Sequence, residues 1–218
     1  MRRLLGWCLL VGACGGDGTC ATPSAIAFDA TSFFSTQPGG GSLPWMHTVT
    51  GTDTALLVEI EAPPPTSVSY AGMPMHREMS ASGSPQLWSL SPAPPGTASI
   101  DIVGLGNPFN GFAVSYTGVR SADPVDVTTG SCQTGAGVFT FNFPTTADDA
   151  AAIVVGLMPN GYATPTSTSG QTGRAAYPTY LDQIPVAPGS TVTVNFTAGQ
   201  SQPQTVCATG FGIRPACH

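Results

Sequence analysis

Short runs of apolar residues, either continuous or alternating with polar residues, recur along this chain from residue 25 onward. In the segment 138–143 (VFTFNF), Phe139, Phe141 and Phe143 share one face and polar residues occupy the other. Such period-2 alternation is typical of β-strands with one buried face. The clearest runs are 55–60, 66–70, 86–90, 97–103, 112–117, 138–143, 151–158, 191–197 and 205–213, and the weaker ones are 25–29, 45–49, 73–78 and 125–128.

The pattern contains no amphipathic helical segment of ten or more residues. The segment 148–157 (DDAAAIVVGL) admits a helix capped by Asp148, but Pro159 and the Ile-Val-Val run favour a buried strand. Strands that follow one another about every 8–15 residues without βαβ spacing indicate a sandwich or barrel. We therefore expect an all-β fold, an antiparallel two-sheet β-sandwich of jelly-roll type, formed as a single domain by residues 25–218.

Five segments of the first half follow one another as WMHTVTG, ALLVEI, PTSVSYAGMPM, LWSLSPAPPGTASIDI and GFAVSYTGV. They resemble a module of bacterial secreted and cell-surface proteins with the order W-x-H-T-V-x-G, L-L-V-V, V-x-x-V-x-Y-x-G, L-W-x-L-x-x-P-P-x-G-T-x-x-V and G-x-x-V-S-[FY]-x-G-V. The resemblance covers residues 28–124 closely and 125–218 loosely. It implies a lectin-like jelly roll with no established activity. This chain departs from the module in four additional cysteines, no Trp in its second half and a shorter loop after ALLVEI.

The first fourteen residues, MRRLLGWCLLVGAC, resemble the export signal of bacterial lipoproteins. Two arginines precede an apolar stretch that is far shorter than the ~20 residues needed to span a bilayer. The tetrad VGAC at 11–14 resembles the lipobox, which implies cleavage before Cys14 and acylation of this cysteine. The alternative is an ordinary cleaved signal peptide, cut after Ala13 or Ala21.

We therefore expect a signal peptide at residues 1–13 and a flexible Gly- and Thr-rich tether at residues 14–24. In many Gram-negative lipoproteins an aspartate after the lipidated cysteine implies retention at the inner membrane, whereas this chain has Gly15. The expected location is the bacterial outer membrane or cell surface, outside the cytoplasm and anchored by lipid.

Charge narrows the class of partner. Charged residues make up 8% of the chain, lysine is absent, and the formal net charge is −6. This acidic balance argues against nucleic acid and anionic lipid headgroups, which select basic patches. The expected partners are the membrane, through the lipid anchor, and a glycan or surface protein.

Four cysteines remain after the signal peptide and Cys14, and in an exported protein they indicate two disulfides with three connectivities. We prefer Cys132–Cys207 and Cys20–Cys217, because the second pair would join the chain ends, which commonly lie close together. No pair has C-x-x-C spacing, so a zinc site is not expected.

Motifs of known enzyme chemistry are missing from the sequence. There is no G-x-S-x-G elbow, P-loop, H-E-x-x-H or EF-hand pattern, so we expect no enzyme, no catalytic residue and no resident cofactor. Glu59 and Glu61 share a strand face, where solvated carboxylates are expected. Asp148 and Asp149 fit a turn or a structural calcium site. His47 is either a metal ligand or, as we prefer, a histidine satisfied by a backbone carbonyl.

The region from Tyr162 to Pro188 is predicted to be rich in loops and offers the best candidates for ligand contact. Aromatic rings stack on the apolar faces of sugars, and nearby amide and carboxylate groups bind the hydroxyls. The alternative is a surface region whose tyrosines pack on the edge of the sandwich. The candidate residues are Tyr162, Arg174, Tyr177, Tyr180 and Asp182.

These features together predict a membrane-anchored bacterial surface lipoprotein. Its β-sandwich would be a non-catalytic module for adhesion, envelope structure or ligand binding. The alternative is a carbohydrate-active hydrolase on a jelly-roll scaffold, which would need two suitably spaced carboxylates.

Overall fold

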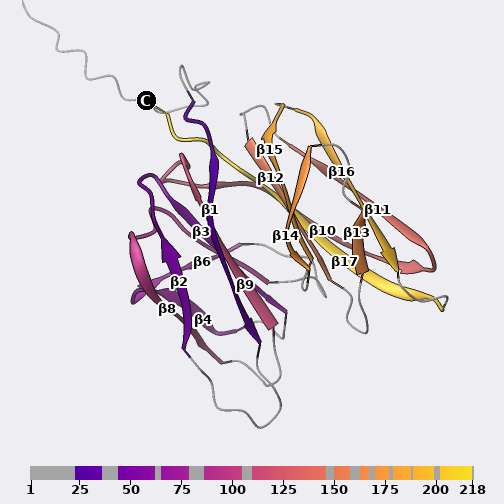
Figure 1. Cartoon of the computed structure of the whole chain (residues 1–218), viewed down its shortest axis with the longest axis horizontal. Coiled ribbons are helices and arrows are strands. Elements are labelled where there is room, and N and C mark those ends of the chain that lie inside the picture. The colour runs from indigo at the N-terminus through magenta and orange to yellow at the C-terminus, as the bar shows by residue number, and fades with distance from the viewer. Residues whose placement is uncertain are drawn as a thin grey trace, which may run out of the picture.

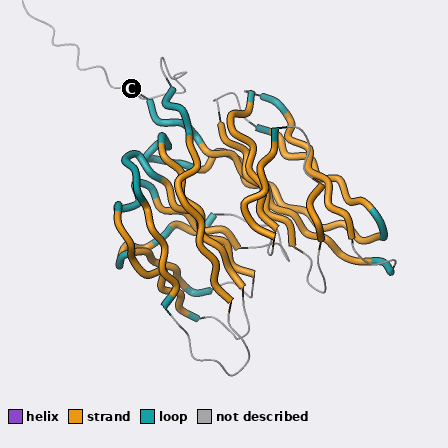
Figure 2. The backbone as a smooth tube through the Cα atoms, viewed as in Figure 1, coloured by secondary structure: helices purple, strands orange, loops and turns teal. Residues whose placement is uncertain are grey.

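Antiparallel strands form the regular structure of the chain. The computed structural model describes residues 23–35, 44–61, 65–78, 86–104, 110–145, 150–157, 163–166, 170–176, 179–187, 189–198 and 202–217. Within these ranges there is no helix (Figure 2), hence none of the length and hydrophobicity needed to cross a membrane. The strands are β1 (Ala27–Ser35), β2 (Trp45–Val49), β3 (Ala55–Glu61), β4 (Ser67–Tyr70), β5 (Met73–Pro74), β6 (His76–Arg77), β7 (Gln86–Leu90), β8 (Gly96–Val103), β9 (Asn110–Thr117), β10 (Val125–Gly135), β11 (Val138–Pro144), β12 (Ala150–Leu157), β13 (Ala163–Thr166), β14 (Gln171–Ala176), β15 (Thr179–Val186), β16 (Thr191–Ala198) and β17 (Gln204–Ile213).

Strands β1 to β9 form a jelly roll. The chain folds back on itself like one long hairpin, in which β1 pairs with β9, β2 with β8, β3 with β7 and β4 with β5. Rolling this hairpin produces two sheets, with the strand orders β1-β9-β3-β7-β6 and β2-β8-β4-β5. Two such interlocked sheets are the jelly-roll arrangement. We call residues 23–119 the N-terminal half.

Strands β10 to β17 repeat three of these four pairings, and we call residues 125–213 the C-terminal half. Here β10 pairs with β17, β11 with β16 and β12 with β15. The two sheets have the orders β10-β17-β12-β15-β14 and β11-β16-β13. Strand β14 lies at the sheet edge beyond β15 as β6 lies beyond β7. The chain is therefore a tandem of two jelly rolls.

The two jelly rolls stack through their larger sheets, which form the two inner layers (Figure 1). Side chains of both halves meet in one apolar cluster between these layers, and each half has a further core of its own. The shared cluster consists of Ala55, Leu57, Leu87, Phe112, Val114, Tyr116 and Val119 with Phe211 and Ile213. The core of the N-terminal half includes Trp45, Leu56, Val58, Trp88 and Ile100, and that of the C-terminal half includes Phe139, Phe141, Phe143, Val194 and Phe196.

The expected all-β antiparallel sandwich of jelly-roll type is confirmed, and its strands form four sheets where the sequence analysis expected two. Inner strands are buried on both faces, so β7 is buried at every position. Outer strands have one solvated face, so β2 and β11 alternate between buried and exposed positions. The segment 150–157 is a strand, as expected. The region 162–188, expected to be loop-rich, instead contains β13, β14 and β15.

Two chain segments connect the halves and are hydrogen-bonded to each other. The linker 118–124 leads from β9 to β10, and the strap 214–217 returns from β17 to the N-terminal half. At the end of the strap, Ser24 N donates to Ala216 O at 2.8 Å, so the described chain begins and ends side by side. Three backbone hydrogen bonds of 2.8–3.0 Å join linker and strap: Arg120 N to Arg214 O, Arg214 N to Pro124 O and Ala216 N to Gly118 O.

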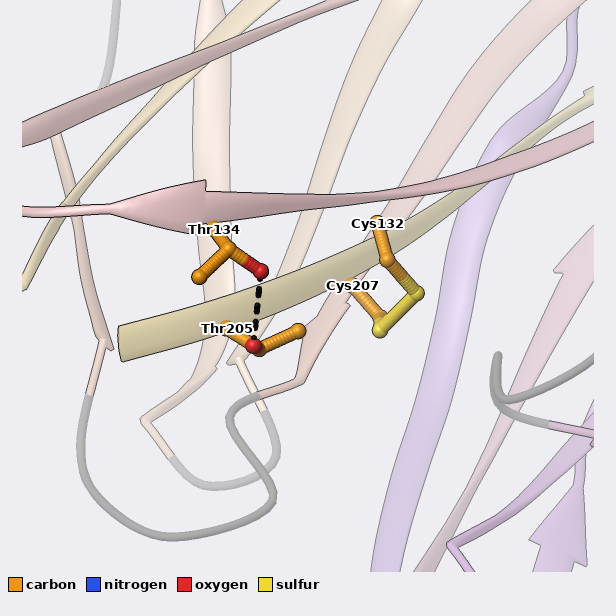
Figure 3. The surroundings of a disulfide bond; sticks show 4 residues. All are labelled: Cys132, Thr134, Thr205 and Cys207. Carbon is orange, nitrogen blue, oxygen red and sulfur yellow. Dashed lines mark hydrogen bonds between the residues drawn. A yellow bond between two sulfur atoms is a disulfide. The ribbon is translucent and has the colours of Figure 1, made fainter. Parts of the chain in front are cut away.

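A disulfide between Cys132 and Cys207 joins β10 to β17, the first and last strands of the C-terminal half (Figure 3). The two residues lie directly opposite each other in the ladder. Two positions further along, Thr134 Oγ1 and Thr205 Oγ1 are 2.9 Å apart. This disulfide is the pairing preferred from the sequence.

Candidate functional site

The polar residues of the motif segments meet inside the N-terminal half, around the imidazole of His47. Strand β2 alternates, so Trp45 and His47 both point into the sandwich, and His47 is 2% exposed. Strands β1 and β9, adjacent in the facing sheet, contribute Ser32 and Ser115. Residues far apart in the sequence are thereby brought to one buried point.

A continuous chain of hydrogen bonds passes through His47. The Ser115 hydroxyl donates to the Asp29 carboxylate, so the Ser115 oxygen must accept from His47 Nε2–H. His47 Nδ1 then remains as an acceptor for the Ser32 hydroxyl. The donor–acceptor distances are Trp45 Nε1 to Ser32 Oγ 2.9 Å, Ser32 Oγ to His47 Nδ1 2.9 Å, His47 Nε2 to Ser115 Oγ 3.1 Å and Ser115 Oγ to Asp29 Oδ2 2.7 Å.

Burial and hydrogen bonding set the charge states of His47 and Asp29 in this hydrogen-bond chain. Desolvation lowers the pKa of His47 from 6.5 to about 4, and the nearby Asp29 carboxylate offsets only part of this effect. Burial also raises the pKa of Asp29, but hydrogen bonds from Thr50 and Ser115 outweigh it and leave that pKa below its ordinary value. At neutral pH the chain therefore holds a neutral imidazole and an ionised carboxylate.

Tyr70, another motif residue, closes the same region from β4. It is fully buried, and its hydroxyl donates to Gly96 O at 2.9 Å and lies 3.3 Å from His47 O. Its ring meets the His47 ring edge-on at 6.3 Å between centroids. Burial is the main cause that raises its pKa. Tyr70 therefore fixes the β2 backbone that positions the imidazole.

The hydrogen-bond chain contains a serine beside a histidine, the pair that serine hydrolases use for nucleophilic catalysis. A serine nucleophile needs an accessible oxygen and a base with a pKa near the working pH. Here the Ser32 oxygen accepts from Trp45 Nε1–H, and the pKa of His47 lies near 4. Because every named polar atom is satisfied by a neighbour, the arrangement is suited to holding β1, β2 and β9 together.

A second polar cluster lies at the junction of the two halves. Arg174 Nε on β14 and Tyr116 Oη on β9 both donate to Asp182 Oδ2 on β15, at 2.8 Å and 3.1 Å. The Arg174 guanidinium carbon also lies 4.1 Å from the centre of the Phe28 ring. Asp182 is 2% exposed and Arg174 is 25% exposed. We call these four residues the clasp, because they join the C-terminal half to the N-terminal half.

The structure thus brings together two of the predicted ligand-contact residues, Arg174 and Asp182, on strands and in mutual contact. Tyr162 and Tyr177 lie outside the described residues. Tyr180 lies on β15 opposite position 155 of β12, and its side chain is likewise outside the described part. The binding role predicted for these five residues stays a prediction.

Glu59 and the cysteines were also the subject of predictions from the sequence. Glu59, expected to be solvated, is 1% exposed and points from β3 into the layer between the halves, where its ladder neighbours Leu87 and Phe112 also lie. Cys217 is disulfide-bonded, and Cys20, like Cys14, lies outside the described residues. The Cys20–Cys217 pairing therefore stays a prediction.

One groove opens beside the linker, with a volume of about 350 Å³. Its floor comes from β5, β6 and β7 of the N-terminal half, and its wall comes from the linker and the first residue of β10. Its polar residues form no motif in the sequence, because they are scattered over short strands and turns. The groove is lined by Pro74, His76, Glu78, Ser89, Leu90, Ser91, Ser121, Asp123, Pro124 and Val125.

A metal site needs several ligating side chains close together. Across the described ranges, no group of three His, Cys, Asp or Glu side chains lies together in a way that could hold a metal ion. His47 is satisfied by two serine hydroxyls, where a backbone carbonyl was expected. Asp148 and Asp149, offered as calcium ligands, lie outside the described residues.

Comparison with known proteins finds no similarity that identifies a family or a function. No protein-family model matches the chain, and no curated protein matches it. A solved structure with some similarity is that of a conserved protein of unknown function from Pseudomonas aeruginosa PAO1. The two sequences are 12% identical, the matched region spans 88% of this chain and 80% of that protein, and the TM-score is 0.29. A TM-score at this level supports no conclusion about function.

Proposed function

We propose that this protein is a lipid-anchored bacterial surface protein whose tandem jelly rolls act as a non-catalytic scaffold. The observation that carries the non-catalytic part is the closed hydrogen-bond chain at His47. The motif residues that converge there bond to one another, and the imidazole is 2% exposed. Residues used in this way stabilise a rigid body on which surface contacts can be displayed.

A location outside the cytoplasm fits the covalent structure. Disulfides persist in oxidising compartments and are rare in the cytosol. The Cys132–Cys207 bond joins the first and last strands of the C-terminal half, and Cys217 is disulfide-bonded as well. Both bonds support the export that the signal-like residues 1–14 suggest.

The non-catalytic part is tested with a fluorophosphonate probe, which labels serines activated by a neighbouring base. We expect no labelling of Ser32, because His47 is a weak base and the Ser32 oxygen already accepts a hydrogen bond from Trp45 Nε1–H. Labelling of the folded protein that disappears in a Ser32→Ala variant would overturn the scaffold proposal.

The anchor is tested at Cys14. A Cys14→Ser variant should lose metabolic labelling by a fatty-acid analogue and leave the membrane fraction, because acyl chains on this residue would supply the anchorage. Cys8→Ser is the matched control, since Cys8 would be removed with the signal, and it should be labelled like the wild type. Undiminished labelling of Cys14→Ser would refute the lipoprotein assignment.

A further inference from the structure

The groove beside the linker has a rigid frame, which is the first requirement of a binding site. Its wall is held by Arg214 N, which donates to Pro124 O at 2.9 Å. On its floor, Ser89 Oγ donates to Glu78 Oε1 at 2.5 Å. Ser91 Oγ, at the corner between floor and wall, donates to Arg120 O at 2.9 Å. The lining is therefore set by the fold before any ligand arrives.

The groove lining combines hydrogen-bonding groups with apolar surfaces. Carboxylates of Glu78 and Asp123 provide acceptors, the hydroxyl of Ser121 provides a donor and an acceptor, and the imidazole of His76 adds a further polar group. Between them lie apolar surfaces of two prolines, Leu90 and Val125. Acceptors for hydroxyl protons beside small apolar patches are complementary to a sugar ring, which has hydroxyls at its rim and C–H groups on its faces.

Charge and size narrow the ligand further. Two carboxylates in the groove, on a chain of formal charge −6, disfavour anionic sugars. The volume of about 350 Å³ lies at the small end of ligand pockets, which span roughly 300–1,000 Å³. One or two sugar rings are the size of ligand that such a groove accommodates.

We infer that this groove binds an uncharged sugar unit, with Glu78 and Asp123 accepting hydrogen bonds from its hydroxyls. The inference deepens the proposed function, because it names the ligand class of a non-catalytic surface module. It rests on that proposal only for the cellular location at which the sugar is bound. The linker forms one wall, so the bound sugar lies against the connection between the two halves.

The test follows backbone amide chemical shifts of the purified full-length protein, kept in one detergent, during titration with four probes. The probes are glucose, N-acetylglucosamine, glucosamine and glucuronic acid. We expect saturable shifts at Ser121 and Asp123 with a neutral probe and a dissociation constant on the order of 1 mM. Shifts with glucosamine alone would show an amine site, and no shift with any probe would show no site; either outcome overturns the inference.

Isosteric variants test how much each of the two carboxylates contributes to sugar binding. Glu78→Gln and Asp123→Asn should each weaken neutral-sugar binding at least about tenfold, because each loses a charged acceptor. Asp101→Asn is the control, because Asp101 is an exposed carboxylate on β8 of the same half and does not line the groove. Equal binding by all three variants would overturn the site, provided that their unfolding midpoints match the wild type.

A chromogenic glycoside distinguishes this inference from the proposed function. Release of nitrophenolate from a neutral nitrophenyl glycoside, lost in Glu78→Gln, would keep the sugar site and overturn the non-catalytic proposal. Binding without release supports both. Loss of sugar binding, with Ser32 unlabelled and Cys14 lipidated, would overturn the groove alone.

Discussion

His47 is the residue at which the fold is linked to pH. Its pKa is about 4 in the folded protein against 6.5 for an ordinary histidine. Between these values the unfolded chain binds more protons than the folded one, so stability falls as the pH falls from 6.5 towards 4. Asp29 adds a further loss at lower pH, because its pKa is held below the ordinary value of 3.8.

Replacing His47 should remove this pH dependence. In urea unfolding the wild type should lose roughly 2 kcal/mol between pH 7 and pH 4.5 through this residue, which is the difference that the two pKa values imply. His47→Gln should be less stable at pH 7 and lose less on acidification. His76→Gln, at an exposed position of β6, is the control and should follow the wild type. A His47→Gln variant with the full wild-type slope would contradict this account.

At the scale of strands, the Cys132–Cys207 disulfide closes the C-terminal half, because it joins β10 to β17 across a sequence separation of 75. A Cys132→Ala/Cys207→Ala variant should lose about 4 kcal/mol of unfolding free energy, since the unfolded chain regains the freedom of a long loop. Chemical denaturation under non-reducing conditions measures the loss.

The neighbouring threonine pair provides the matched control for this disulfide. Thr134 and Thr205 are exposed and lie on the same ladder (Figure 3), so Thr134→Val/Thr205→Val should cost less than about 1 kcal/mol. If both double variants lost equal stability, the disulfide would contribute nothing through loop closure.

Strands were predictable from the sequence because their apolar runs are strong and short. The continuous run 55–60 and the alternating run 138–143 both predict strands, and their difference corresponds to inner and outer sheets. That correspondence shows only when two sandwiches stack, since a strand of a single sandwich has one solvated face. The residues 163–166, 171–176 and 179–186 were expected in a loop-rich region because their Gly, Pro and Thr content resembles turns.

At the scale of the whole molecule, the clasp joins the two halves because an ion pair of the C-terminal half, Arg174–Asp182, contacts Tyr116 and Phe28 of the N-terminal half. Arg174→Ala would leave the Asp182 carboxylate buried without its cation, which should cost about 2 kcal/mol because water partly reaches the arginine site. Thermal unfolding measures the loss. Adding Asp182→Asn should recover part of it by removing the buried charge. Additive losses in the double variant would show that the two side chains do not interact.

Neither the clasp nor the His47 chain was visible in the sequence. Ser115 is a polar residue inside an apolar run, which signals a buried hydroxyl in need of a partner. Its partner Asp29 lies 86 positions away, and only the register of β1 on β9 brings them together. His47 was expected to be satisfied by a backbone carbonyl, but its partners are two serine hydroxyls that the pairing of β1 with β9 places opposite β2.

The paired linker and strap have a mechanical consequence. Domains joined by a single chain can twist about it, because rotation around one backbone breaks no contact. Here two crossing segments run antiparallel and are hydrogen-bonded to each other, so torsion between the halves would shear those bonds. Bending would separate the shared apolar cluster and the clasp, which join the same two halves. The two halves should therefore move as one rigid body.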